Sequence, residues 1–155
     1  MVRKLKKNRR GAAAVEMAIV LPLLLMLTLG AIRYGWLFLK AQQITNAARY
    51  ATRIAIRADA TVDEVMGAID ALFDPNRADI SGYKVRFYRT DPNAATGGED
   101  LTEIEDVSVE VGVPITVTIT VPHENVDIMV VPFVTELEPD GWPLGASTTM
   151  TKEGP

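Results

Sequence analysis

The hydrophobic positions begin with one long apolar run near the N-terminus. From Ala12 to Ile32 almost every residue is apolar, and Glu16 is the only ionisable side chain. As a helix rising about 1.5 Å per residue, this run would extend about 31 Å, close to the roughly 30 Å hydrocarbon core of a bilayer. A buried helix of a globular core normally keeps a polar face, and this run has none. The pattern therefore predicts a membrane span.

The next stretch, from Arg33 to about Ala58, is amphipathic and follows the span with no Gly–Pro punctuation. Its apolar positions are spaced alternately by four and three residues, which is a heptad seam. The seam consists of Leu37, Ala41, Ile44, Ala48, Ala51, Ala55 and Ala58. The opposite face carries Gln42, Gln43, Asn46, Arg49, Arg53 and Arg57. Because most seam residues are alanines, each buries little area, and we expect the seam to need many copies or a covering domain.

Aromatic residues mark the boundary between these two stretches. Tyr34, Trp36 and Phe38 follow directly on the apolar run. Aromatic side chains are enriched where a span leaves the hydrocarbon, so we expect these three to form an aromatic belt at the outer interface.

A short second helix is predicted after the long one. Thr61 and Glu64 have the spacing of a capping box, and Val62–Phe73 carries an apolar stripe at helical spacing. Asp74-Pro75-Asn76 should end this helix.

Beyond it, alternating β-branched residues predict strands at Tyr83–Arg89, Ile104–Val111, Val113–Val121 and Leu144–Lys152. A polar loop is expected from Thr90 to about Glu103. Two of these strands, Ile104–Val111 and Val113–Val121, would form a hairpin around Gly112, with Pro114 favouring an edge position or a bulge. The predicted fold class is α+β, with a long transmembrane and stalk helix, a short helix and a C-terminal antiparallel sheet.

Charge follows the same division of the chain. Residues 1–11 hold six cations and no acid, residues 12–58 have net charge +4, and residues 59–155 have net charge −14. Cationic flanks stay on the cytoplasmic side of a span, so we expect a cytoplasmic N-terminus and an exported acidic domain. Such an acidic domain would repel phosphate, which argues against a nucleic-acid partner. The chain has no cysteine, which excludes disulfides and thiolate chemistry.

Glu16 is the unusual residue of the apolar run. A charged carboxylate inside hydrocarbon costs several kcal/mol and should have a partner or a role. If the chain were cut after Gly11, the new ammonium of Ala12 would lie one helical turn from Glu16, on the same face of the helix. This ammonium would neutralise Glu16 of its own chain or of a neighbour, and Glu16 would lie favourably at a helix N-terminus.

This arrangement resembles the leader of type IV prepilins, in which a membrane aspartyl peptidase cuts after a glycine and the fifth mature residue is glutamate. Gly11 and Glu16 match that spacing, and Pro22 lies where pilin stalks often have a helix-bending proline. The run RRGAAAVEMAIVLPLLLMLTLGAIRYGWLF, followed by QQITNAARYATRIAI, is similar to the TadE-like family, minor pilins of the tight-adherence (Flp) system. Near the C-terminus, LGASTTMTKE resembles the short Ala/Ser-rich strand that ends this family. Met17 stands where the major pilins of the system carry tyrosine, and those pilins are much shorter, which favours a minor pilin.

The resemblance implies three regions: a basic leader (1–11), a transmembrane and stalk helix (12–58), and an exported α+β domain (59–155). It implies processing at Gly11, Ala12 and Glu16. Expected partners are membrane lipid, other pilins, the prepilin peptidase and the pilus assembly platform. The expected assembly residues are Glu16, Pro22, Leu37, Ile44, Ala48, Ala51 and Ala55. We expect a single-pass protein of the bacterial inner membrane, possible also in the extracellular pilus. The alternative is an uncleaved signal-anchored protein whose exported domain binds an envelope partner or ligand.

The remaining polar residues give weaker signals. Arg49, Arg53 and Arg57 form a cationic stripe that would either be solvated or meet acids of the same or a neighbouring domain. His123 is the sole histidine and is expected to be structural. Six acids, which lack the spacing of a calcium loop, are expected to be solvated: Glu99, Asp100, Glu103, Glu105, Asp106 and Glu110. With no catalytic set or phosphate-binding loop, we expect no enzyme activity, no cofactor or metal site and no small-molecule substrate.

Overall fold

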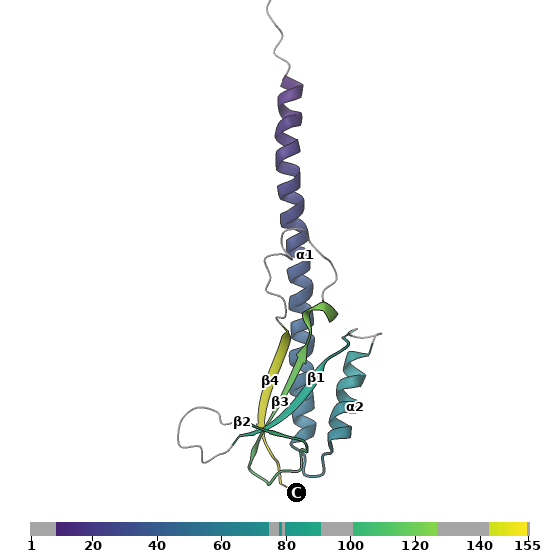
Figure 1. The fold of residues 1–155 in the computed structure, drawn as a ribbon, viewed down its shortest axis with the longest axis vertical. Coiled ribbons are helices and arrows are strands. Elements are labelled where there is room, and N and C mark those ends of the chain that lie inside the picture. Colours follow the sequence, from purple (N-terminus) through teal and green to yellow (C-terminus); the bar gives the residue numbers. More distant parts are fainter. Residues whose placement is uncertain (1–8, 75–77, 79, 91–100, 127–142, 155) are drawn as a thin grey trace, which may run out of the picture.

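The computed structural model describes residues 9–74, 78, 80–90, 101–126 and 143–154. These residues form a long helix α1 (Arg9–Ala55), a shorter helix α2 (Val62–Phe73) and a sheet of four strands (Figure 1). The strands are β1 (Lys84–Thr90), β2 (Leu101–Ile104), β3 (Pro114–Val121) and β4 (Leu144–Thr151), in the order β2-β1-β3-β4. All three pairings are antiparallel, which confirms the α+β fold class.

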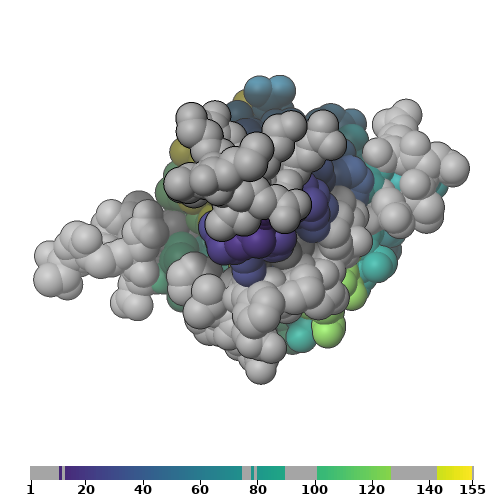
Figure 2. All heavy atoms as spheres, turned by 90° about the horizontal axis from the view of Figure 1, so that it is seen from above, coloured from purple at the N-terminus to yellow at the C-terminus, as the bar shows by residue number. Residues whose placement is uncertain are grey.

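Helix α1 is a single element of 47 residues that passes through Pro22. At about 1.5 Å per residue it extends about 70 Å, more than twice the thickness of the hydrocarbon core of a bilayer. Figure 1 shows its N-terminal half standing clear of the sheet and its C-terminal half lying against the strands. Figure 2, which looks along the helix, shows the folded domain spreading to both sides of the purple N-terminal end.

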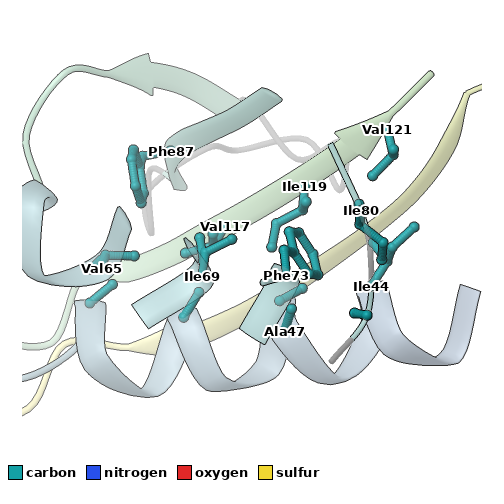
Figure 3. Packing of buried hydrophobic residues seen from close by; sticks show 14 of the residues in the cluster. Ile44, Ala47, Val65, Ile69, Phe73, Ile80, Phe87, Val117, Ile119 and Val121 are labelled. Carbon is teal, nitrogen blue, oxygen red and sulfur yellow. The ribbon is translucent and has the colours of Figure 1, made fainter. Parts of the chain in front are cut away.

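The core lies where the C-terminal half of α1 meets the sheet. On the helix, Ile44, Ala48, Ala51 and Ala55 have no exposed surface. On β3, alternate residues from Ile115 to Val121 face the helix and are equally buried. Figure 3 shows Ile44 and Ala47 pointing toward the side chains of β3. The small alanines let the sheet approach the helix closely, so the predicted seam is covered by the chain's own domain.

Helix α2 closes one side of this core and has the predicted bounds. The hydroxyl of Thr61 accepts a hydrogen bond from the backbone N–H of Glu64, which confirms the N-cap. The Glu64 carboxylate, which would bind the backbone of Thr61 in a full capping box, instead pairs with Arg57. The distance from its oxygen to the guanidinium nitrogen is 2.7 Å. Val65, Ile69 and Phe73 are the buried face of α2.

The predicted hairpin around Gly112 is wrong. β2 ends at Ile104 and pairs with β1, with Phe87 opposite Ile104, and residues 105–113 are not strand. The Asp106 carboxylate accepts hydrogen bonds from the backbone N–H and the hydroxyl of Ser108, which bends the chain locally. The alternation of Val107 and Val109 therefore belongs to a turn-rich segment in which Val107 fills the core.

The predictions of the other three strands are confirmed. β1, β3 and β4 agree with the predicted ranges to within one residue at each end. β3 is an inner strand, so the edge position predicted from Pro114 is wrong. Pro114 is the first residue of β3, where the missing N–H of proline is tolerated. Gly112, with φ of +87°, supplies the left-handed turn residue just before the strand.

Candidate processing site and assembly surfaces

The predicted processing residues lie in the first turns of α1. Gly11 and Glu16 are both exposed there, and open space surrounds the position of a Cβ on Gly11. Ala12 precedes Glu16 by four helical residues, about 6 Å along the axis. Residues 1–8 of the basic leader lie outside the described residues. The three residues therefore lie within the first two turns of α1, with Gly11 and Glu16 exposed.

The apolar run behind these residues presents its side chains outward. Leu23 and Leu27 expose 64% and 74% of their surface. Pro22, which precedes them in the helix, is exposed as well. Within the described residues, one helix is long and apolar enough to cross a membrane, and its most apolar window has no part buried inside the protein. This exposed apolar helix fits a single-pass membrane anchor.

Trp36 and Lys40, just after the apolar run, contact the domain, and Arg33 is buried beside them. Arg33 is fully buried and Lys40 nearly so. The indole N–H of Trp36 donates to the carbonyl oxygen of Val126 at 2.9 Å, and the Lys40 ammonium lies 4.9 Å from the centre of the Trp36 ring. Lys40 also donates to the carbonyl of Ala78. The domain thus contacts α1 within the first turns after the predicted membrane span.

Sequence reasoning missed this junction. Trp36 was expected in the aromatic belt, but it turns toward the domain, whereas Tyr34 and Phe38 are exposed. A usable signal was present: Arg33, Leu37, Lys40 and Ile44 are spaced by four, three and four residues, so the two cations continue the apolar seam.

The C-terminal end of α1 is held by another residue that the sequence analysis did not single out. The Lys152 ammonium is buried and donates to the carbonyl oxygens of Ala55 and Val107, both at 3.1 Å. Ala55 is the last residue of α1, where carbonyls lack intrahelical partners and cations are favourable. Burial lowers the pKa of Lys152, and the negative charges of Asp106 and Asp59 offset this lowering only in part. Lys152 thereby ties the last strand to the end of the stalk.

The seam predicted for assembly lies inside the domain. Ile44, Ala48, Ala51 and Ala55 pack on the chain's own sheet, and Leu37 packs against the same core. Ala58 is exposed, because α1 ends at Ala55 and the chain turns there. Any effect of these buried residues on assembly would therefore act through the fold of the domain.

The cationic stripe divides into two parts. Arg57 lies 2.7 Å from a carboxylate oxygen of Glu64 and 3.6 Å from one of Asp59. Arg49 and Arg53 are exposed and make no ion pair with any residue that the structure describes. Among the described residues of the domain, acids therefore pair with Arg57 and not with Arg49 or Arg53.

Arg49 and Arg53 line an open groove between α1 and the C-terminal end of α2. This α1–α2 groove has a volume of about 560 Å³. Its lining includes Gln43, Asn46, Arg49, Tyr50, Arg53 and Phe73. The amide oxygen of Gln43 is buried there and accepts no hydrogen bond from the described residues. The groove combines two guanidinium groups with aromatic surface, a combination suited to an acidic chain segment.

The remaining candidates that the structure describes do not gather into a chemical site. His123 lies in a short 3-10 helix (His123–Asn125), and Glu103, Glu105, Asp106 and Glu110 are exposed. Glu99 and Asp100 lie outside the described residues. Among the residues that the structure describes, no three potential metal-ligating side chains gather in one place.

An exposed apolar helix followed by a domain fastened to its C-terminal half is the build of a membrane-anchored, pilin-like protein. The model of the TadE-like protein family matches residues 11–53, so the resemblance expected from the sequence is confirmed over this helix. The match covers less than a third of the chain and ends two residues before α1 does. No curated protein and no solved structure matches the chain. The family match suggests a structural, pilin-like protein associated with the Tad pilus.

Proposed function

We propose that this chain is a minor pilin, cut after Gly11 by a prepilin peptidase and assembled through its apolar helix into a Tad (Flp) pilus or its base. The observation that carries this proposal is the coincidence of two features. The TadE-like match begins at Gly11, and the exposed apolar side chains of α1 begin within its first residues, with Val15 as the first large one. Basic residues before it and an acidic domain after it support a cytoplasmic N-terminus and an exported domain.

The position of Gly11 within α1 bears on how the cut would happen. A peptidase that binds an extended substrate needs residues around Gly11 to leave the helix. The first turn is the part of a helix that leaves most readily, because its N–H groups have no intrahelical partners. Glycine lowers helix stability by about 1 kcal/mol relative to alanine, which favours local unwinding at this position. The same residue leaves space for the peptidase, since nothing in the domain approaches it.

After the cut, the ammonium of Ala12 and the carboxylate of Glu16 would form a charge pair one helical turn apart. Two such charges attract strongly in a low-dielectric surrounding, where leaving one of them unpaired is costly. In an assembly, Glu16 would instead reach the ammonium of a neighbouring chain and fix the axial register of the two stalks. Pro22 and the outward leucines would supply the apolar surface through which the stalks meet.

The experiment that tests the proposal is determination of the mature N-terminus in the native host. Intact mass and N-terminal sequencing of the membrane pool should give a chain that starts at Ala12. Gly11→Trp should leave the full-length chain uncut, whereas Gly11→Ala, which keeps a small side chain, should be cut. Retention of Met1 in the exported pool of the unaltered protein would instead support the uncleaved signal-anchored alternative.

The role of Glu16 has its own test. Glu16→Gln keeps the size of the side chain and removes its charge, so we expect normal cutting and about a tenfold loss of co-purification with other pilins. Ala14→Gln, which adds the same amide to a nearby exposed position, is the matched control and should co-purify normally. Equal recovery of Glu16→Gln and the unaltered chain would remove Glu16 from assembly.

A further inference from the structure

The α1–α2 groove and the far end of the sheet carry opposite charges. We propose that the groove binds the acidic segment 102–110 of a second copy of this chain, so that successive copies join head to tail. This inference rests on the proposed assembly function and names the surfaces that would meet outside the membrane.

The α1–α2 groove offers two cations that form no ion pair with a described residue. Arg49 and Arg53 are exposed and have no ion-pair partner among the described residues, whereas Arg57, one turn further on, is already paired with Glu64. They are four residues apart on α1, so their Cα atoms are separated by about 6 Å along the helix axis. Two guanidinium groups at this spacing present parallel donors to carboxylates.

The acidic segment, TEIEDVSVE, contains four acids and no cation. Ile104 packs against the core, so the neighbouring Glu103 and Glu105 are directed away from it and are exposed. In extended chain, residues two apart are separated by about 6.7 Å, which matches the spacing of Arg49 and Arg53. The two pairs of charges are therefore complementary in sign and in separation.

The acids of the segment are available for such a contact. Glu105 and Glu110 make no ion pair with any described residue. Glu103 has an exposed pairing with Arg86 at 3.8 Å, and exposed pairs of this kind contribute little. Asp106 is also exposed and negatively charged, but its carboxylate accepts hydrogen bonds from Ser108, so the three glutamates have more free acceptor oxygens for a neighbour.

The two surfaces lie on opposite sides of the same molecule. Figure 1 shows β2, which begins the acidic segment, on the left of α1 and α2 on the right. A contact between different surfaces is heterologous, and it builds an open chain of copies unless the rotation closes a ring. Tyr50, half exposed at the groove, and the edge of Phe73 would contact the aliphatic stems of the entering glutamates. A donor from the second copy would also reach the unsatisfied oxygen of Gln43 after a rotation of its side chain.

The test uses the full chain in its native membrane with a photo-crosslinking phenylalanine derivative in place of Tyr50. Irradiation should give an adduct of two copies, with the attached peptide drawn from residues 101–113. Arg49→Glu combined with Arg53→Glu should lower the yield of this adduct about tenfold, because attraction becomes repulsion at both positions. Raising the salt concentration should lower it as well, since these charges are exposed.

A charge exchange separates a lost contact from a damaged fold. Co-expression of the Arg49→Glu, Arg53→Glu chain with a chain carrying Glu103→Arg and Glu105→Arg should restore the adduct. Lys84→Glu, which reverses an exposed cation on β1 away from the groove, is the matched control and should keep the full yield. An adduct with another protein or another segment, no adduct, or an unchanged yield after reversal of Arg49 and Arg53 would each overturn the inference. If the chain nevertheless starts at Ala12, the proposed function stands without it.

Discussion

The two halves of α1 belong to one helix, yet their apolar side chains have different surroundings. Between residues 13 and 32 the side chains are mostly large and exposed, as Leu23 and Leu27 illustrate. Between residues 44 and 55 the buried side chains are mostly alanine and are covered by the rest of the domain. In lipid, large apolar side chains contact fluid chains and need no matching surface, whereas a sheet packs closely only against small ones. Side-chain size, more than hydrophobicity, therefore distinguishes the anchor from the stalk.

The border between the halves is sharp and is marked by charge. Arg33 and Lys40 are the first cations after the apolar run, and both are buried where the domain meets the helix. Lys152 has the matching place at the other end of the stalk, where its ammonium binds the carbonyl of Ala55. The C-terminal half of α1 thus has buried cations at both of its ends, whereas residues 13–32 contain no lysine or arginine.

The largest expected effect comes from separating the halves. Removal of residues 1–32 should give a domain that stays in solution without detergent, because the exposed apolar side chains that require lipid are gone. The fragment begins at residue 33 because Arg33 is buried at the junction with the domain. A fragment that begins at residue 36 would lack this side chain. Size-exclusion chromatography with light scattering measures the outcome, with the chain from residue 12 as the control that should partition into membranes. Aggregation of the 33–155 fragment in every buffer would show that the division is misplaced.

The second prediction tests whether small size is what the stalk requires. Ala51→Leu in the soluble fragment should lower the free energy of unfolding by about 3 kcal/mol, because three added carbons must fit between a helix and a sheet. This corresponds to a fall in melting temperature of roughly 10 °C. Ala58→Leu is the matched control: it continues the same heptad pattern but is exposed, and should change stability by less than about 0.5 kcal/mol. Equal melting of the two variants would contradict the size argument.

Much of this fold was predictable because local signals and tertiary structure agree. The Thr61 cap and the stripe from Val62 to Phe73 specify α2 without help from the rest of the chain. β3 and β4 have long β-branched or alternating runs and were placed to within one residue. The heptad seam also identified the buried face of α1, although periodicity alone could not say whether another stalk or the chain's own sheet would cover it.

The errors have different physical causes. Val107 and Val109 alternate as in a strand, but the Asp106 side chain binds the backbone of Ser108 and turns the chain. Pro114 cannot donate to a ladder, yet as the first residue of β3 it needs no donor. The hydrogen bonds of Trp36 to Val126 and of Lys152 to Ala55 join residues 90 and 97 positions apart, and no local pattern carries such information. Of the candidate site, Gly11, Ala12 and Glu16 came from the resemblance to prepilin leaders and stay a prediction, whereas the groove required α2 to be placed beside α1.

The smallest predicted effect concerns the contact that holds α2 over the stalk. The Tyr83 hydroxyl donates to the Asp70 carboxylate, and its ring meets that of Phe73 edge to face at 5.0 Å. Burial, with the hydrogen bond and the charge of Asp70, raises the pKa of Tyr83 to about 12. Because the folded state keeps the proton longer than the unfolded state, with its pKa near 10, this stabilisation is complete below pH 10. It is lost as the pH rises through about 12.

Tyr83→Phe keeps the ring contact and removes the proton. We expect the free energy of unfolding of the soluble fragment to fall by about 1 kcal/mol below pH 10, with a shallower decline between pH 10 and 12 than in the unaltered fragment. Urea unfolding at a series of pH values measures both effects. Tyr50→Phe is the control, since its hydroxyl binds no described residue, and it should keep the original decline. If Tyr83→Phe kept the same slope, the hydroxyl would not couple to Asp70, and α2 would be held over the stalk by its apolar face alone.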